Sequence, residues 1–141
     1  MNKIIIHTDG GARGNPGPAG IGVVIEDETG EVHAEISEYI GETTNNVAEY
    51  HALIRALGEA KVLFGERTLE LPFEIMMDSE LVVRQCQGVY KVKEPKLKEM
   101  FAMVAQMRLE DFPNITFTHI YREKNARADK LVNEAIDEAL K

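Results

Sequence analysis

Apolar, β-branched residues recur over the first forty positions in three runs separated by turn-forming stretches. The runs cover residues 3–9, 20–26 and 31–40 and are rich in Ile and Val. Between the first two, residues 10–20 contain five glycines and two prolines, a composition that favours a tight bend and lets a ligand approach the backbone. Residues 27–30 form a plain hairpin turn. The pattern predicts an antiparallel meander of three strands.

After residue 45 the apolar spacing changes to every third or fourth position, which is typical of a helix with one buried face. Tyr50, Leu53, Ile54 and Leu57 predict a helix that runs to about residue 64. Similar spacing predicts helices over 79–88 and 95–107, and extended runs predict strands over 69–77 and 115–120. The expected buried face of a C-terminal helix comprises Ala128, Leu131, Val132, Ala135 and Ala139.

This order of elements predicts an α/β fold: a mixed five-stranded sheet flanked by helices, formed by residues 1–141 as a single domain. In such sheets, ligands bind beyond the carboxyl ends of neighbouring parallel strands. Asp9 and Asp78 stand at the ends of two predicted strands. Their carboxylates are therefore expected to converge if these strands are neighbours.

Composition narrows the class of protein. At 141 residues and 44% hydrophobic, the chain can bury one core, and no apolar run is long enough to span a bilayer. The apolar stretch near the N-terminus, residues 4–6, is too short for a signal peptide, so we expect a cytoplasmic protein. The single cysteine, Cys86, excludes an internal disulfide and a zinc finger.

The formal charge of −8 argues against a simple electrostatic nucleic-acid binder. Four lysines, at positions 91, 93, 96 and 98, form the one concentrated basic stretch, and such a run is usually a solvated surface. Divalent cations held by carboxylates would change this picture, because they neutralise the most negative region and make it attract phosphate.

Four acids are candidates to hold such cations, although each also has a structural explanation. Asp9 could be a turn residue, Glu49 has capping-box spacing from Asn46, Asp78 could cap the helix after it, and Asp129 suits a helix N-terminus. Magnesium prefers oxygen ligands, and a nuclease that uses two metal ions needs several carboxylates at one place. The acids therefore have to be considered together.

Taken together, the motifs resemble those of type 1 ribonuclease H over nearly the whole chain and in the same order. The specific ones are Thr8-Asp9-Gly10-Gly11, Gly14-Asn15-Pro16-Gly17 and Thr43-Thr44-Asn45-Asn46-Val47-Ala48-Glu49, with weaker matches at Met77-Asp78-Ser79-Glu80 and Ala128-Asp129-Lys130-Leu131. The resemblance implies a ribonuclease H-like fold with sheet order 3-2-1-4-5. The chain lacks the basic helical handle and the loop histidine of many relatives, and so resembles a compact, archaeal-like branch.

The resemblance also implies an activity: endonucleolytic hydrolysis of the RNA strand of RNA/DNA hybrids by two metal ions, leaving 5'-phosphate and 3'-hydroxyl ends. Asp9, Glu49, Asp78 and Asp129 correspond to the family's catalytic, metal-binding set. Two Mg²⁺ ions per site are expected, with Mn²⁺ accepted in their place. The expected partner is the hybrid itself, bound by a monomer without an obligate protein partner.

For substrate contacts, the resemblance implicates the first glycine-rich connection and the start of the first helix. Amides suit the 2'-hydroxyl of RNA, which both donates and accepts hydrogen bonds. Two structural alternatives stay open, since Asn15 could only set the turn and Asn46 could only cap the helix. Lys91 and Lys93 are expected to substitute in part for the missing handle. The full set of expected contacts is Gly10, Gly11, Arg13, Asn15, Thr44, Asn45, Asn46, Lys91 and Lys93.

Two rival functions remain to be weighed. A proofreading-type exonuclease or a junction resolvase could share the fold, but proofreading exonucleases usually carry Asp-x-Glu on the first strand, and here Gly11 stands two residues beyond Asp9. A catalytically silent module that only binds hybrids is the second rival. The presence of all four acids argues against it.

Overall fold

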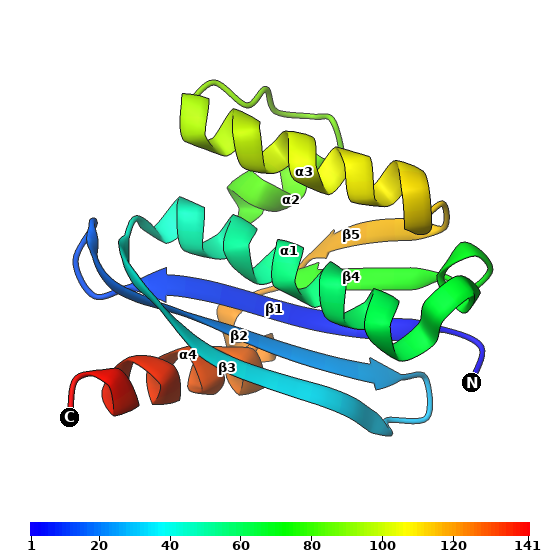
Figure 1. Cartoon of the computed structure of the whole chain (residues 1–141), viewed down its shortest axis with the longest axis horizontal. Coiled ribbons are helices and arrows are strands. Elements are labelled where there is room, and N and C mark those ends of the chain that lie inside the picture. The colour runs from blue at the N-terminus through cyan, green and yellow to red at the C-terminus, as the bar shows by residue number, and fades with distance from the viewer.

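A computed structural model describes all residues, 1–141, as one sheet with helices on both of its faces (Figure 1). The strands are β1 (Ile4–Ala12), β2 (Gly17–Asp27), β3 (Val32–Thr43), β4 (Phe73–Met77) and β5 (Ile115–His119). The helices are α1 (Asn45–Phe64), α2 (Glu80–Cys86), α3 (Pro95–Asp111) and α4 (Ala126–Ala139), with short 3-10 turns η1 (Gly65–Leu69) and η2 (Arg122–Lys124).

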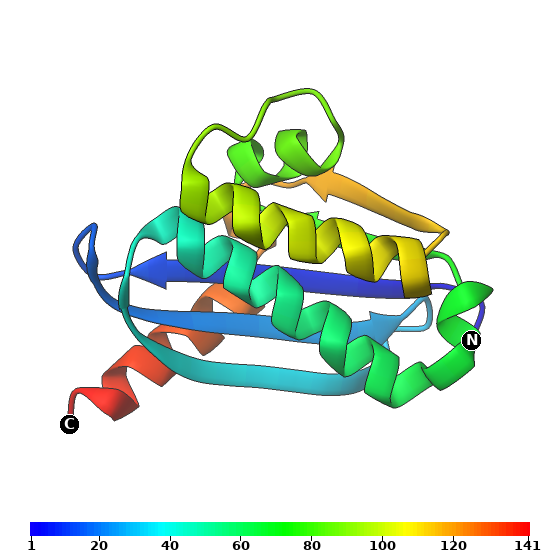
Figure 2. The same ribbon diagram turned by 45° about the horizontal axis from the view of Figure 1, so that its top comes forward.

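The sheet is mixed, and its strands run in the order β3-β2-β1-β4-β5. β1 is antiparallel to β2 and β2 to β3, whereas β4 is parallel to β1 and β5 to β4. The predicted meander and the predicted order 3-2-1-4-5 are therefore confirmed. Figure 2 shows α1 and α3 side by side over one face of the sheet, with α4 on the other face.

The larger core lies between the sheet and the layer of α1, α2 and α3. Ile4 and Ile6 on β1 and Ile75 on β4 point into it and are fully buried, because alternate residues of a strand face the same side. Leu53 and Leu57 of α1 meet them from above, each burial contributing roughly 1.5–3 kcal/mol. No helix of the chain combines the length and the apolarity needed to cross a bilayer.

Two expected boundaries and one expected buried residue are wrong. Residues 10–12 and 17–20 are not a loop but strand, paired as Gly10 with Ile21 and Gly11 with Gly20, so only residues 13–16 turn. β4 begins at Phe73 rather than at residue 69, because residues 65–69 form the turn η1. Ala139, expected to be buried on α4, is exposed, and Ile136 is buried on that helix instead.

Candidate active site

The parallel pairing of β1 with β4 sets the first two acids side by side. Thr8 pairs with Met77, and this is the last paired position between the two strands, so Asp9 and Asp78 follow at the same level. The sequence predicts that Asp9 ends β1, but β1 continues beyond it to Ala12, where it pairs with β2 alone. The convergence of the two acids is nevertheless as the strand order predicts.

Two glycines let the acid-bearing helices approach the sheet closely. A Cβ atom on Gly10 would collide with the carbonyl oxygen of Ala48 in α1, and a Cβ on Gly22 would collide with that of Ala128 in α4. Each of these carbonyls belongs to the residue just before the acid of its helix. The missing side chains on β1 and β2 therefore bring both helix backbones, and the acids they carry, against the strands.

The capping roles that the sequence left open belong to other residues. Thr44 caps α1 and Ser79 caps α2, each accepting a 3.3 Å hydrogen bond from the backbone amide three residues on. Asn46 therefore does not cap α1, Glu49 does not stand at capping-box spacing from its cap, and Asp78 lies outside α2. Neither of these two acids has a capping function.

Asp9, Glu49 and Asp78 form a tight group, with one carboxylate oxygen of each within 4.8 Å of the others. We call these three residues the cavity cluster. Glu49 and Asp9 are only 5% and 7% exposed. Glu49 accepts a hydrogen bond through Oε1 from the amide of Gly10, but its Oε2 is buried and has no partner. Negative charge is thus held in a place where few donors balance it.

Burial and mutual repulsion shift the protonation of this cluster. Burial, and then the neighbouring charge of Asp78, raise the pKa of Asp9 to about 7. The pKa of Glu49 lies well above its ordinary value for the same causes, burial and then the charge of Asp9. The pKa of Asp78 is also raised, chiefly by burial. A divalent cation would relieve this repulsion and supply the missing partner, and carboxylate oxygens are the ligands Mg²⁺ prefers.

Asp129 approaches from α4 and borders the same cavity as the cavity cluster. Its side chain is 33% exposed and lies 3.7 Å from the guanidinium of Arg122. Arg122 begins η2, in the loop where the resemblance led us to look for a histidine. Arg122 and Arg13 are the two basic residues that line the cavity.

The four acids line one open cavity of about 520 Å³. The other expected contacts that line it are Gly10, Gly11, Arg13, Asn45 and Asn46. Sequence reasoning missed Val132, Asn133 and Ile136, which line the cavity from α4. A signal for Asn133 was available, because it stands four residues after Asp129 and so on the same face of the helix.

Four expected contacts lie outside the cavity: Asn15, Thr44, Lys91 and Lys93. Asn15 accepts a hydrogen bond from the amide of Asn45 at 3.0 Å, and the side-chain oxygen of Asn45 accepts from the amide of Ala12 at 2.8 Å. These amide oxygens therefore tie the turn 13–16 to the start of α1. The side-chain nitrogens of both asparagines make no hydrogen bond within the chain.

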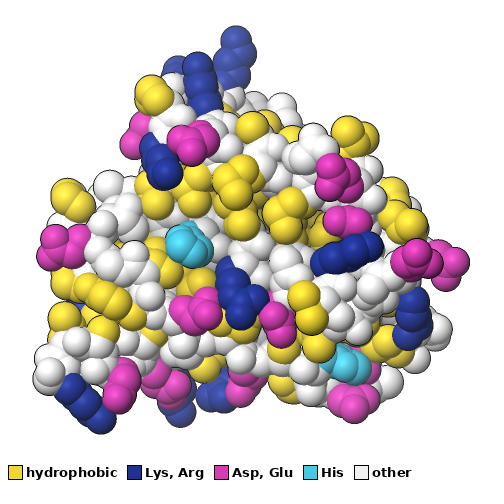
Figure 3. Space-filling model, in the orientation of Figure 1, with side chains coloured by type: hydrophobic (Ala, Val, Ile, Leu, Met, Phe, Trp, Pro, Cys, Tyr) yellow, Lys and Arg dark blue, Asp and Glu magenta, His cyan; other side chains and the backbone are white.

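The basic residues differ in how much they are engaged. Arg13 contacts α4 through Asp137 at 2.7 Å and through the side chain of Asn133 at 3.2 Å, so its charge is already partnered. Lys91 and Lys93 are exposed in the connection between α2 and α3. Figure 3 shows basic side chains gathered at the top of the view, where Figure 1 places this connection. No helical handle is inserted there.

Comparison with known proteins gives the chain a family. Residues 7–135 match the model of the family described as reverse transcriptase-like. The chain is 42% identical over 138 residues to a bifunctional protein of Mycobacterium tuberculosis, covering 97% of this chain but 36% of that protein. It is 41% identical over 137 residues to ribonuclease HI of Halobacterium salinarum, covering 97% of this chain and 66% of that enzyme. The chain thus spans about a third of the first of these relatives.

Solved structures agree with this assignment. The structure of LC11-RNase H1, isolated from compost by a metagenomic approach, is 68% identical with a TM-score of 0.96, and all of both chains is covered. LC11-RNase H1 has also been solved in complex with an RNA/DNA hybrid, at 67% identity and a TM-score of 0.95, covering 99% of this chain and 100% of that one. The chain therefore belongs to the ribonuclease H family and has ribonuclease HI among its relatives.

Proposed function

We propose that this chain is a nuclease that hydrolyses the RNA strand of RNA/DNA hybrids endonucleolytically, using two divalent cations and leaving 5'-phosphate and 3'-hydroxyl ends. The observation that carries the proposal is the cavity cluster itself. Two buried carboxylates and a half-buried one, all with raised pKa values and one with an unpartnered oxygen, border an open cavity together with a fourth acid. These carboxylate oxygens are ligands suited to Mg²⁺, with Mn²⁺ as a substitute.

Within this proposal the four acids divide the work. Asp9 and Asp78 would hold both cations, Glu49 would hold the cation on the leaving-group side, and Asp129 would hold the one on the side of the attacking water. When bound, the cations lower the pKa of that water and neutralise charge that develops on the phosphorus. The partial exposure of Asp129, at 33%, supports its assignment to the side that water reaches.

We assign hybrid recognition to the glycine-rich strand ends and the start of α1. Gly10 and Gly11 present backbone in the cavity, where no side chain keeps a substrate away. Asn15 and Asn45 keep unpaired side-chain nitrogens that suit the 2'-hydroxyl of RNA, and we assign Thr44 and Asn46 to contacts with backbone phosphates. The hybrid complex of LC11-RNase H1 supports this class of substrate.

On the DNA strand, we assign a phosphate-binding role to the exposed lysines at positions 91 and 93. Their place between α2 and α3, without a handle, makes this contribution small. Arg13, engaged with α4, acts in this proposal mainly by holding the turn 13–16. These assignments separate residues that hold the substrate from the acids that act on the scissile phosphate.

The deciding experiment uses one labelled RNA strand offered as a hybrid with DNA, as a duplex with RNA, and alone, with Mg²⁺ or with EDTA. We expect cutting of the hybrid only, dependent on Mg²⁺, with fragments that carry 5'-phosphates. Asp78→Asn should stop the cutting, whereas Asp27→Asn, a change in a buried acid outside the site, should not. Equal cutting of single-stranded RNA would contradict the proposal, and binding without cutting would favour the silent module.

A further inference from the structure

Asn125 is a buried polar residue for which the proposed reaction has no role. It is 1% exposed and stands immediately before α4. Asparagine at this place normally caps its helix, but here the side chain makes no capping hydrogen bond. Its Oδ1 is buried without a partner. A side chain kept in the interior with one polar atom unsatisfied is held there by something other than its own helix.

The hydrogen bonds of Asn125 join two distant parts of the chain. Its side-chain nitrogen donates to the backbone oxygen of Thr8 at 2.9 Å, across 117 residues of sequence. Its backbone oxygen accepts from the amide of Asp129 at 3.1 Å. Thr8 is the residue just before Asp9. A single residue thus bonds directly to the first turn of α4, which carries one acid, and to the strand position next to another.

Other contacts hold α4 against β2, β3 and the turn 13–16, but none of their hydrogen bonds or ion pairs reaches β1 beside Asp9. α4 packs on β2 through the close backbone approach at Gly22. Ser37 of β3 donates to the carbonyl of Leu131 at 2.6 Å, and Arg127 pairs with Glu35 of β3 at 2.6 Å. Arg13 at the turn pairs with Asp137. The ion pair between Arg122 and Asp129 is long, at 3.7 Å, and the arginine side chain is 78% exposed, so it is a weak restraint. The amide of Asn125 supplies the directional, buried link between α4 and β1.

We propose that Asn125 is a positioning residue, which sets the separation between the carboxylates of Asp9 and Asp129 by bonding both chain segments that carry them. The inference rests on the proposed metal-dependent hydrolysis and adds a residue to it. Groups that orient metal ligands, when removed, typically cost roughly 10- to 100-fold in metal affinity or activity. Asn125 acts here on the backbone that carries the ligands rather than on a ligand atom.

The test measures Mn²⁺ binding by calorimetry, and kcat and KM on a hybrid, for Asn125→Ala. We expect Mn²⁺ affinity and kcat to fall by roughly 10-fold or more while KM for the hybrid changes little. The same substitution made in an Asp129→Asn background should lower kcat and Mn²⁺ affinity by less than about 2-fold, because the acid it positions is already lost. Equal losses in both backgrounds would overturn the positioning role.

A matched control separates positioning from stability. Thr68→Val also removes a buried polar group, one whose hydroxyl donates to the carbonyl of Gly65 at 3.0 Å in η1, away from the site. It should lower the melting temperature but leave Mn²⁺ affinity and kcat unchanged. If Asn125→Ala does not fold, Asn125→Ser replaces it under the same criteria. A wild-type chain that neither binds Mn²⁺ nor cuts hybrids refutes the proposed function instead, before any variant is compared.

Discussion

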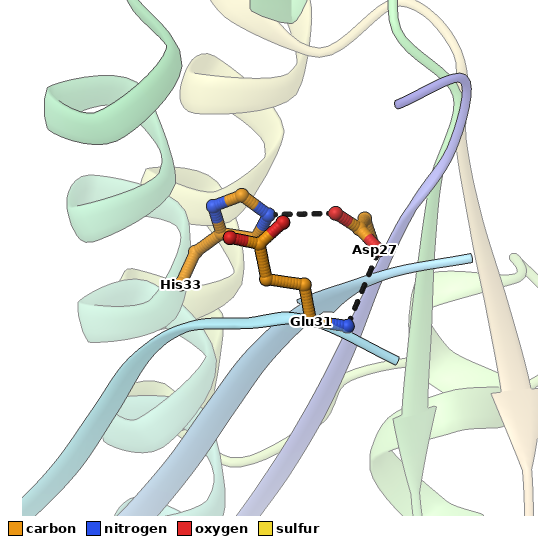
Figure 4. Close-up of side chains that lie close together, drawn as sticks. All are labelled: Asp27, Glu31 and His33. Carbon is orange, nitrogen blue, oxygen red and sulfur yellow. Dashed lines mark hydrogen bonds and ion pairs between the residues drawn. The ribbon is translucent and has the colours of Figure 1, made fainter. Parts of the chain in front are cut away.

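Two clusters of ionisable side chains lie near opposite ends of β1. Each contains a buried aspartate, but the pKa of that aspartate is raised in one cluster and lowered in the other. The cavity cluster holds Asp9, Glu49 and Asp78, and the second group, here named the hairpin cluster, holds Asp27, Glu31 and His33 where β2 turns into β3 (Figure 4). In each, the possible ligand atoms lie within 4.8 Å of one another. By spacing alone, both could hold a metal ion.

Hydrogen-bond donors distinguish them. In the hairpin cluster, Asp27 is 3% exposed and accepts hydrogen bonds from the amide and hydroxyl of Thr29 and from Nε2 of His33 at 2.9 Å. The bond from the Thr29 hydroxyl, followed by that from His33, holds the pKa of Asp27 far below its ordinary value. Donors of the chain itself stabilise the charge of Asp27, so the cluster holds the hairpin together without an ion.

In the cavity cluster, acceptors face acceptors. A buried oxygen of Glu49 finds no donor, and burial together with neighbouring charge raises the pKa values. The comparison teaches that neither burial nor crowding of acids identifies a functional site. A shortage of hydrogen-bond donors around buried carboxylates does identify one. Such a cluster is unfavourable in the chain alone and becomes favourable when a cation binds. Three predictions test this contrast, in order of decreasing expected effect.

The largest contrast should appear on neutralising one acid in each cluster. Asp9→Asn should reduce hybrid cleavage by more than roughly 100-fold, the upper range for groups that merely support metal ligands, and should raise the melting temperature of the metal-free protein by removing repulsion. Asp27→Asn should leave cleavage unchanged and lower the melting temperature, since an amide cannot accept all the bonds that the carboxylate does. Cleavage rates and thermal melts in EDTA measure both effects. Parallel shifts in the two variants would erase the distinction.

A smaller contrast concerns the response to Mg²⁺ itself. At a concentration 100 times its dissociation constant, a ligand that binds only the folded state stabilises it by about 2.7 kcal/mol. We expect a gain of this order for the wild type and for Asp27→Asn, and little gain for Asp9→Asn. Urea denaturation with increasing Mg²⁺ gives the free energy of unfolding in each case. A gain that depended on Asp27 rather than on Asp9 would place the ion in the hairpin.

The smallest effect is a difference in pH dependence without metal. Asp9 has a pKa of about 7 in the folded chain against about 4 when unfolded, so the folded state binds more protons between these values and stability should fall as pH rises through them. Asp27 has a lowered pKa, so its contribution is present above pH of about 4 and is lost as pH falls below that. Denaturation in EDTA gives the free energy of unfolding at each pH. Compared with the wild type, this free energy should fall less steeply with rising pH in Asp9→Asn, and less steeply with falling pH in Asp27→Asn. A variant whose pH dependence of unfolding equalled that of the wild type would show that another group causes the loss of stability in that pH range.

Sequence periodicity could predict the elements and their order along the chain because it reports which face of a segment is buried, and the long helices here bury one face. The strand order in the sheet, which the family resemblance implied, then sufficed to predict that Asp9 and Asp78 meet. It could not predict that residues 10–12 continue β1, because local composition favours a turn and only pairing with β2 decides otherwise. The glycines of residues 10–20 predict a tight bend, whereas the structure uses Gly10 and Gly20 for the close approach of the helices to the sheet.

Contacts between distant residues account for the rest. Arg13 is an expected substrate contact, yet its guanidinium is partnered by Asp137, which lies 124 positions further along and carries no motif. Asn125 has the residue type of a helix cap, and only the folded chain shows its side chain turned to β1 instead. Capping by Ser79 rather than Asp78 was a choice between two adjacent, equally suitable residues. Such choices are settled by tertiary geometry.

The close approach at Gly10 and Gly22 bears on attempts to transplant this chemistry. Both acid-bearing helices contact the strands through a backbone carbonyl, at positions where a methyl group would already collide. Copying only the acids onto another layered α/β protein would leave α1 and α4 standing further from the sheet, with their carboxylates too distant from those of the strands. A working graft would therefore need glycine at the positions of Gly10 and Gly22 as well as the four acids.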